Sequence, residues 1–199
     1  MRRIIDFGSA IDLYTLQNLY GSSGPTRYEE TEEYSPPEST LQGNWWRVHG
    51  NQVNRYDLWS IGIVMLELIL GTPHVFQIHD RTRALLDKHL EGWGSSALNT
   101  AYLLRAMMEM CILYPGKHGH HRPGAMDSSN PASWVCTEEN LMLQIKTHDP
   151  LGIGLGDIWA LRLLRAFLQW HPEDRITVEE ALKHPYFHPS VQGTEDEKN

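Results

Sequence analysis

One local cluster of side chains whose type could do chemistry consists of three imidazoles, His118, His120 and His121. Imidazole nitrogens bind zinc, so this cluster could form a metal site. Adjacent histidines in a Gly-rich loop hold poor ligand geometry, however, and no pair of cysteines flanks them. We therefore expect an exposed loop over 114–135 that holds no metal.

Asp57 is a second candidate, because it lies in the first turn of an apolar run over 56–71. The middle of this run carries a single charge, Glu67. Such a run is too long for a typical strand, and it stops at Gly71 before the roughly 20 apolar residues that a membrane span needs. We expect a central helix enclosed on all sides by the domain, with Asp57 binding backbone of another segment.

Length and charge exclude several classes of protein. With 199 residues the chain can form one domain with a sizeable core. Its net charge of −8 and its lack of a basic block argue against a nucleic-acid surface. Cys111 and Cys136 make no disulfide framework, which favours a reducing, intracellular compartment, first of all the cytoplasm. The first 30 residues contain no apolar run typical of a signal peptide, and we expect no transmembrane segment.

The pattern of residues predicts short strands at the start and helices in the second half. Gly, Pro and acidic residues over 18–50 indicate a long loop. Thr177 and Glu180 form a capping-box pattern at the start of a last helix. The expected elements are strands at 2–5 and 9–12, helices at 80–90, 96–113, 138–147, 157–170 and 177–184, and a disordered tail at 189–199.

Four motifs then occur in one order along the chain. They are Asp6-Phe7-Gly8, Pro36-Pro37-Glu38, the run Asp57-Leu58-Trp59-Ser60-Ile61-Gly62, and the segment from His171 to Arg175. Together the motifs resemble the C-terminal lobe of a eukaryotic-type Ser/Thr protein kinase, from its magnesium-binding motif onward. The resemblance covers roughly 2–91 and 157–188, and the segment of about 92–156 between them matches no motif and would be an insertion.

This resemblance implies a mainly α fold, the truncated large lobe of the protein-kinase-like α+β fold, with one or two short strands at the N-terminus. The partial kinase domain would span 1–188, with an activation segment at 6–38. Asp6 would ligate the magnesium that bridges the ATP phosphates, Phe7 would set its orientation, and Gly8 would act as a hinge. Thr31, three positions before Tyr34, would contact the catalytic base. Pro36 replaces the alanine usual in the family, which loosens the expectation about substrate docking.

The resemblance also implies structural roles for several residues. Glu38 would pair with Arg175, because a bidentate guanidinium–carboxylate pair can hold the end of a loop onto a helical body. Trp59 and Ser60 would fasten the substrate-docking segment, and Gly62 would permit close packing. Phosphorylation would fall on residues where kinases are modified, for which the candidates are Ser22, Ser23, Thr26 and Tyr28. Fixed negative charge from Glu29, Glu30, Glu32 and Glu33 is one alternative there, and a merely solvated acidic loop is the other.

The sequence lacks other kinase motifs: the glycine-rich strand pair, the strand lysine and the His-Arg-Asp loop. We therefore expect this chain alone to be inactive and to bind ATP and magnesium poorly. Asp57, which would anchor the catalytic loop, is expected to lack its usual backbone donors. The partner would be a protein substrate or a protein that binds the helical lobe. A pseudokinase-like interaction scaffold and a truncated gene-model fragment stay open as alternatives.

Overall fold

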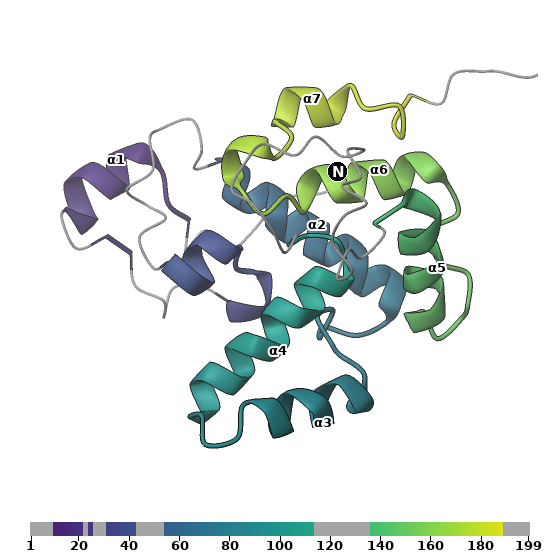
Figure 1. The fold of residues 1–199 in the computed structure, drawn as a ribbon. Coiled ribbons are helices and arrows are strands. Elements are labelled where there is room, and N and C mark those ends of the chain that lie inside the picture. The colour runs from purple at the N-terminus through teal and green to yellow at the C-terminus, as the bar shows by residue number, and fades with distance from the viewer. Residues whose placement is uncertain (1–9, 22–23, 26–30, 43–53, 114–135, 189–199) are drawn as a thin grey trace, which may run out of the picture.

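The computed structural model describes residues 10–21, 24–25, 31–42, 54–113 and 136–188 (Figure 1). No strand occurs among these residues, so the predicted mainly α architecture is confirmed. The predicted strand at 2–5 lies outside the described residues. The one at 9–12 is wrong for residues 10–12, because Asp12 instead caps a helical turn and its Oδ1 accepts a hydrogen bond from the Thr15 N–H at 2.7 Å.

Seven α-helices occur in the described part of the chain. They are α1 (Leu13–Thr15), α2 (Asn54–Leu70), α3 (Asp80–His89), α4 (Ser95–Glu109), α5 (Glu138–His148), α6 (Ile158–Phe167) and α7 (Val178–Leu182). Short helical turns precede α2 and α7, namely η1 (Leu16–Tyr20), η3 (Glu32–Tyr34), η4 (Glu38–Gln42) and η7 (Pro172–Asp174). The loop predicted over 18–50 therefore contains local helical structure.

Side-chain caps begin α6 and α7 where the sequence predicts them. Asp157 accepts a hydrogen bond from the Trp159 N–H at 2.9 Å. Thr177 Oγ1 accepts from the Glu180 N–H at 3.2 Å, and Glu180 Oε2 accepts from the Thr177 N–H at 2.9 Å. The predicted capping box is thus confirmed, and these bonds satisfy amides that lack a partner within the helix.

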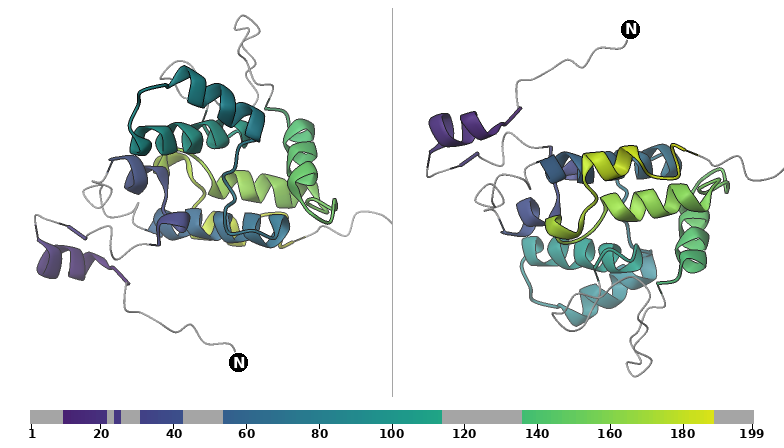
Figure 2. Two further views of the ribbon diagram at one scale, coloured as in Figure 1. Left: turned by 90° about the horizontal axis from the view of Figure 1, so that it is seen from below. Right: turned by 90° about the horizontal axis from the view of Figure 1, so that it is seen from above.

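The core forms between α2 and α6, two helices that lie against each other in Figures 1 and 2. A Cβ atom at Gly62 would lie 2.7 Å from Leu168 Cδ2 and 2.9 Å from its Cγ, so only glycine allows this approach. Helices α4 and α5 close the core on its other sides. The buried side chains of this cluster are Trp59, Ile63, Leu66, Leu70, Val75, Met107, Ile112, Leu141, Ile145, Leu161, Leu164 and Leu168.

One side of α2 is open, which corrects the prediction that the domain encloses this helix. Ile61, Val64 and Leu68 are 47%, 43% and 80% exposed. Their spacing places them on one side of the helix, away from the positions that pack on α6. The prediction failed because apolar residues occur on both sides of α2, whereas its packing partners cover only one. We call these three residues the outer stripe of α2.

Cys111 and Cys136 form a disulfide with their Cα atoms 5.7 Å apart, so the prediction of unpaired cysteines is wrong. The bond joins the end of α4 to the residue before the N-cap of α5. Their separation of 25 positions in the sequence carries no sign of this contact, which depends on how α4 and α5 pack. The argument for a reducing compartment therefore loses its basis.

The predicted helix at 96–113 ends early, because Cys111 has a left-handed φ of 56°. The Ile112 N–H then bonds back to the Met107 carbonyl at 2.9 Å, a pattern that closes many helices. Among the described helices, none combines the length and the apolar character needed to cross a membrane.

Candidate functional site

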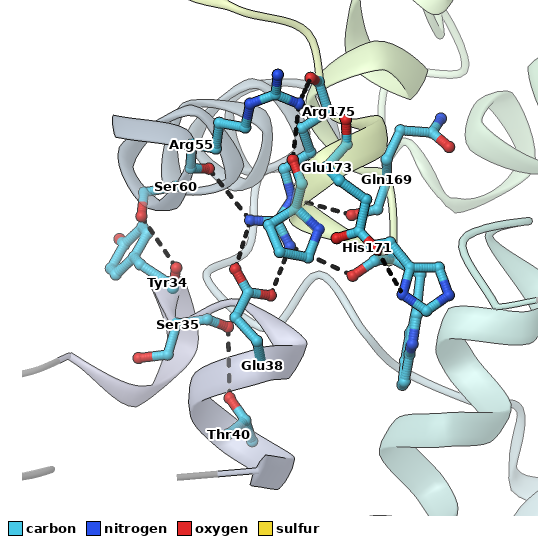
Figure 3. A network of polar contacts seen from close by, with 12 residues as sticks. Tyr34, Ser35, Glu38, Thr40, Arg55, Ser60, Gln169, His171, Glu173 and Arg175 are labelled. Carbon is cyan, nitrogen blue, oxygen red and sulfur yellow. Dashed lines mark hydrogen bonds and ion pairs between the residues drawn. The ribbon is translucent and has the colours of Figure 1, made fainter. Parts of the chain in front are cut away.

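Only some of the predicted site residues belong to the described part of the chain. Those outside it are Asp6, Phe7, Gly8, Ser22, Ser23, Thr26, Tyr28, His118, His120 and His121. The roles predicted for them in magnesium binding, hinge motion and phosphorylation stay predictions. Most of the others gather where turns η3 and η4 meet the first half of α2 and the loop before α7 (Figure 3).

Glu38 and Arg175 form a bidentate ion pair at this place. Arg175 Nη1 donates to Glu38 Oε1 at 2.7 Å, and Nη2 donates to Oε2 at 2.6 Å. Arg175 is 1% exposed and Glu38 is 7% exposed. Each of these buried charges requires the other, because a buried charge without a partner has lost its hydration and gains nothing in return. The pair therefore joins the start of η4 to the C-terminal part of the chain.

The remaining donors of Arg175 bond to backbone carbonyls around it (Figure 3). Its Nε donates to the Gln169 carbonyl at 2.9 Å, Nη1 to the Arg55 carbonyl at 3.1 Å and Nη2 to the Trp170 carbonyl at 3.4 Å. A guanidinium has five N–H donors, and each of them has a partner here. Arg175 thus fixes two backbone segments, 169–170 and the start of α2, as well as Glu38.

Trp59 and Arg55 complete the connection between α2 and the loop before α7. The Arg175 guanidinium carbon lies 5.0 Å from the centre of the Trp59 ring, a cation–π contact. Trp59 is fully buried, and its indole Nε1 lacks a hydrogen-bond partner within the described part of the structure. Arg55 Nη1 donates to the Pro172 carbonyl at 2.8 Å and also to the Glu173 and Arg175 carbonyls.

Residues 34 and 35 are attached to α2 by side chains of that helix. Ser60 Oγ donates to the Tyr34 carbonyl at 3.0 Å, as Figure 3 shows. The Tyr56 hydroxyl donates to Ser35 Oγ at 3.1 Å. Positions 56 and 60 lie one turn apart on the same face of α2, so both reach the same short stretch of backbone.

Glu67 lies further along that face and accepts a hydrogen bond from the hydroxyl of Tyr34. The two oxygens of its carboxylate are 3.0 and 2.9 Å from this hydroxyl. The hydrogen bond to Glu67 raises the pKa of the Tyr34 phenol above its usual value. This contact was not predicted, although Glu67 is the only charge in the middle of the apolar run, and such a charge needs a partner.

Thr31 and Asp57 are described, but neither joins this network through its side chain. Thr31 is exposed, and its carbonyl accepts from the Tyr34 N–H at 3.0 Å. For Asp57, the described residues supply neither a hydrogen bond nor an ion pair, and partial burial raises the pKa of its carboxyl. Its predicted anchoring role stays a prediction.

The network is suited to holding backbone in place. It immobilises residues 34–38 against α2 through neutral and charged hydrogen bonds, and the Pro36 and Pro37 side chains are fully buried beside it. In the part of the chain that the structure describes, no three His, Cys, Asp or Glu side chains come together to hold a metal ion.

The model of the protein kinase domain family matches residues 1–187 of the chain. No solved structure matches it. A protein of Arabidopsis thaliana named "Probable inactive protein kinase" is 54% identical over 193 residues, which are 94% of this chain and 50% of that protein.

More distant relatives are named as kinases. Mitogen-activated protein kinase 15 of Xenopus laevis is 26% identical over 197 residues, with 92% of this chain and 26% of the relative covered. Dual specificity protein kinase CLK4 of Homo sapiens is 29% identical over 198 residues, with 93% and 32% covered. The chain therefore spans half the length of the Arabidopsis protein and about a quarter to a third of these two kinases.

Proposed function

Because the chain belongs to the protein kinase domain family, we propose that it is the large-lobe part of a Ser/Thr-type kinase domain and that these residues alone do not transfer phosphate. Phosphoryl transfer depends on positioned nucleotide, metal ions and a base that orients the hydroxyl. The 199 residues contain no glycine-rich strand pair, strand lysine or His-Arg-Asp loop to provide them. The Arabidopsis relative named as a probable inactive kinase supports this proposal.

The observation that carries the proposal is the attachment of residues 34–38 to α2 and Arg175. In the family that the sequence resembles, the activation segment ends on the large lobe at this position. Here the Glu38–Arg175 pair and the Ser60 and Glu67 contacts hold residues 34–38 on the helical body, which supports this role for them. The chain thus keeps the support on which a substrate segment would dock, while the residues that would act on a substrate are not in its sequence.

ATP and magnesium are the cofactors that the family uses in general. Asp6, the residue proposed to ligate magnesium, lies outside the described residues, and among the described ones no three His, Cys, Asp or Glu side chains come together. We therefore assign no reaction step to a magnesium-nucleotide site. We further propose that the protein acts on or binds other proteins, and its net charge of −8 argues against nucleic-acid binding.

Titration of the purified chain with ATP in the presence of magnesium, followed by calorimetry, tests the proposal. We expect no saturable binding and no phosphate transfer to a general protein substrate. Magnesium-dependent ATP binding in the range usual for kinases, lost in Asp6→Ala and retained in Asp80→Ala, would overturn it. Asp80 is the matched control because it is an exposed aspartate in the first turn of α3.

A binding function is the second candidate, and the outer stripe of α2 favours it. Three large apolar side chains are exposed on one side of this helix, and an exposed apolar patch favours contact with another protein. We propose that a protein partner of this chain contacts Ile61, Val64 and Leu68.

A photo-crosslinking amino acid at position 68, introduced in cells, tests this contact. The same group at position 143 is the control, because Leu143 is also exposed, at 60%, but lies on α5. We expect a defined crosslinked protein from position 68 that is absent from position 143. Crosslinking that is equal at both positions would exclude the outer stripe as a specific surface.

A further inference from the structure

A small cavity lies between the end of α2, the loop over 71–79 that follows it, and helices α4 and α5. Its volume is about 60 Å³. A water molecule needs about 10–15 Å³ of such space, whereas pockets that hold whole small molecules measure about 300–1,000 Å³. The cavity can therefore hold a few waters or the end of one side chain, and it is too small for a whole nucleotide or metabolite.

The cavity has an apolar floor and a polar rim. Leu70, Val75 and Ile145 line it and are buried, so they form its floor. His74 and Gln77 line it and are exposed, so the cavity opens to the surface beside the loop over 71–79. Apolar walls below a polar opening suit the methylene groups of a long side chain that carries a polar end.

Glu109, the last residue of α4, brings a negative charge to the cavity and is only 6% exposed. Its Oε1 accepts a hydrogen bond from Arg105 Nε at 2.9 Å, whereas Oε2 receives none from the described residues. In that part of the chain, Trp59 Nε1 is the only fully buried side-chain nitrogen or oxygen without a partner, so Glu109 Oε2 still reaches solvent. A nearly buried carboxylate oxygen with an open acceptor position favours a positively charged donor.

Neutral side chains add further acceptors around the cavity. His148 Nδ1 lies 2.9 Å from the Gln144 carbonyl, and because a carbonyl only accepts, Nδ1 carries the hydrogen and Nε2 of the neutral ring is an acceptor. The side chains of Gln144 and Gln77 also line the cavity, and each has an amide oxygen. None of the described lining residues is a lysine or an arginine. The cavity thus offers one carboxylate and several neutral acceptors to a cation with more than one N–H group.

We propose that this cavity is a docking site for a basic side chain, first of all an arginine, of a partner protein. A guanidinium has five N–H donors in one plane, which match acceptors on several sides better than the single nitrogen of a lysine does. The net charge of −8 attracts a basic partner. The inference does not rest on the proposed lack of phosphate transfer, and it uses residues other than the outer stripe of α2.

Titration of the isotope-labelled full chain, followed by nuclear magnetic resonance, tests the proposal. The probes are Nα-acetyl-arginine amide, its lysine counterpart, and Nα-acetyl-citrulline amide, which has the shape of the arginine probe without its charge. We expect the arginine probe to shift the amide signals of Val75, Glu109 and Gln144 saturably. The citrulline probe should bind about tenfold more weakly or less, because it lacks the charged hydrogen bond to Glu109. The lysine probe should bind with an affinity between these two.

Three variants locate the binding. Glu109→Gln keeps the size of the side chain and removes its charge, and it should weaken binding of the arginine probe about tenfold. Gln77→Lys puts a positive charge at the opening and leaves the buried Glu109 in place, so it should weaken binding without disturbing the core. Gln17→Lys is the matched control, because Gln17 is also exposed but lies on η1. This control adds the same charge and should bind the probe like the wild type.

Several results would overturn the proposal. Absence of a saturable shift up to the solubility limit of the arginine probe would show that the cavity does not bind it. Equal affinities for the arginine and citrulline probes would show that the charge is not recognised. Equal effects of Gln77→Lys and Gln17→Lys would reveal attraction to the net charge of the chain and not to this cavity. The comparison of these two variants decides the matter even if Glu109→Gln fails to fold.

Discussion

Arg175 illustrates how much one side chain can contribute when each of its donors has a partner. Two of its N–H groups donate to Glu38. The other three donate to the backbone carbonyls of Gln169, Arg55 and Trp170. A lysine would provide three donors on one atom and could not reproduce this fork. The arginine is therefore specific to its position and is not a general positive charge.

Arg175→Ala should destabilise the chain strongly. The substitution leaves Glu38 charged and buried without its partner, which typically costs about 3–5 kcal/mol. We expect a lower melting temperature and faster proteolysis within residues 31–42, with Arg175→Lys between alanine and wild type. Circular dichroism and mass-resolved limited proteolysis measure both effects.

Arg162→Ala is the matched control, since it removes a bidentate pair that is exposed. Such a pair contributes about 0–1 kcal/mol. If Arg175→Ala melts and is cleaved like the wild type, or like Arg162→Ala, then the pair with Glu38 does not hold the segment.

Asp149 should make the stability of the folded chain depend on pH, and the sign of this dependence follows from the contacts of its carboxylate. Hydrogen bonds from the Gly154 and Leu151 N–H groups hold the pKa of its carboxyl below the ordinary 3.8. A lowered folded-state pKa adds stability that is present above the unfolded value and is lost as the pH falls through the folded value. The urea midpoint of the wild type should therefore exceed that of Asp149→Asn most clearly near neutral pH, and the difference should shrink in acid. A difference that is constant with pH would contradict this.

At the scale of elements, the close packing of α2 on α6 depends on a glycine, Gly62, at their contact. The nearest atoms to a Cβ at Gly62 include Leu168 Cγ at 2.9 Å and Phe167 Cβ at 3.0 Å. Both atoms lie close to the α6 backbone, so they cannot move aside without the helix. The two helices can approach this closely only because residue 62 has no Cβ.

Gly62→Ala should destabilise the chain although alanine favours helices. The gain in helix propensity is about 1 kcal/mol, whereas overpacking a core typically costs about 1–3 kcal/mol. We expect a net loss in chemical denaturation. Gly156→Ala is the control, because no atom lies within 4 Å of a Cβ there. An equal or higher midpoint for Gly62→Ala would show that α6 can shift freely.

At the scale of the whole molecule, contacts between the two halves of the chain should make unfolding cooperative. Arg55 at the start of α2 bonds to carbonyls at 172–175, and Arg175 bonds to Glu38. We expect a single melting transition with the same midpoint by near- and far-ultraviolet circular dichroism. A broad transition, or different midpoints from the two probes, would favour the interpretation of the chain as a fragment that does not fold stably.

Local signals in the sequence predicted much of this fold. The helix at 56–71 is observed at Asn54–Leu70, and the caps at Asp157 and Thr177 are present, because each depends on neighbours in the sequence. The Cys111–Cys136 bond and the Tyr34–Glu67 contact were not predicted, since both depend on how distant elements pack. The exposure of the outer stripe of α2 was missed for the same reason.

The pairing of Glu38 with Arg175 has a consequence for the chain while it is being synthesised. The two residues are 137 positions apart. At a synthesis rate of about 5–20 residues per second, Glu38 is added to the chain roughly 7–27 seconds before Arg175. During that interval Glu38 lacks its partner, and residues 34–38 depend on the contacts of Tyr34 and Ser35 with α2. The segment is thus held less firmly on the nascent chain until Arg175 has been added.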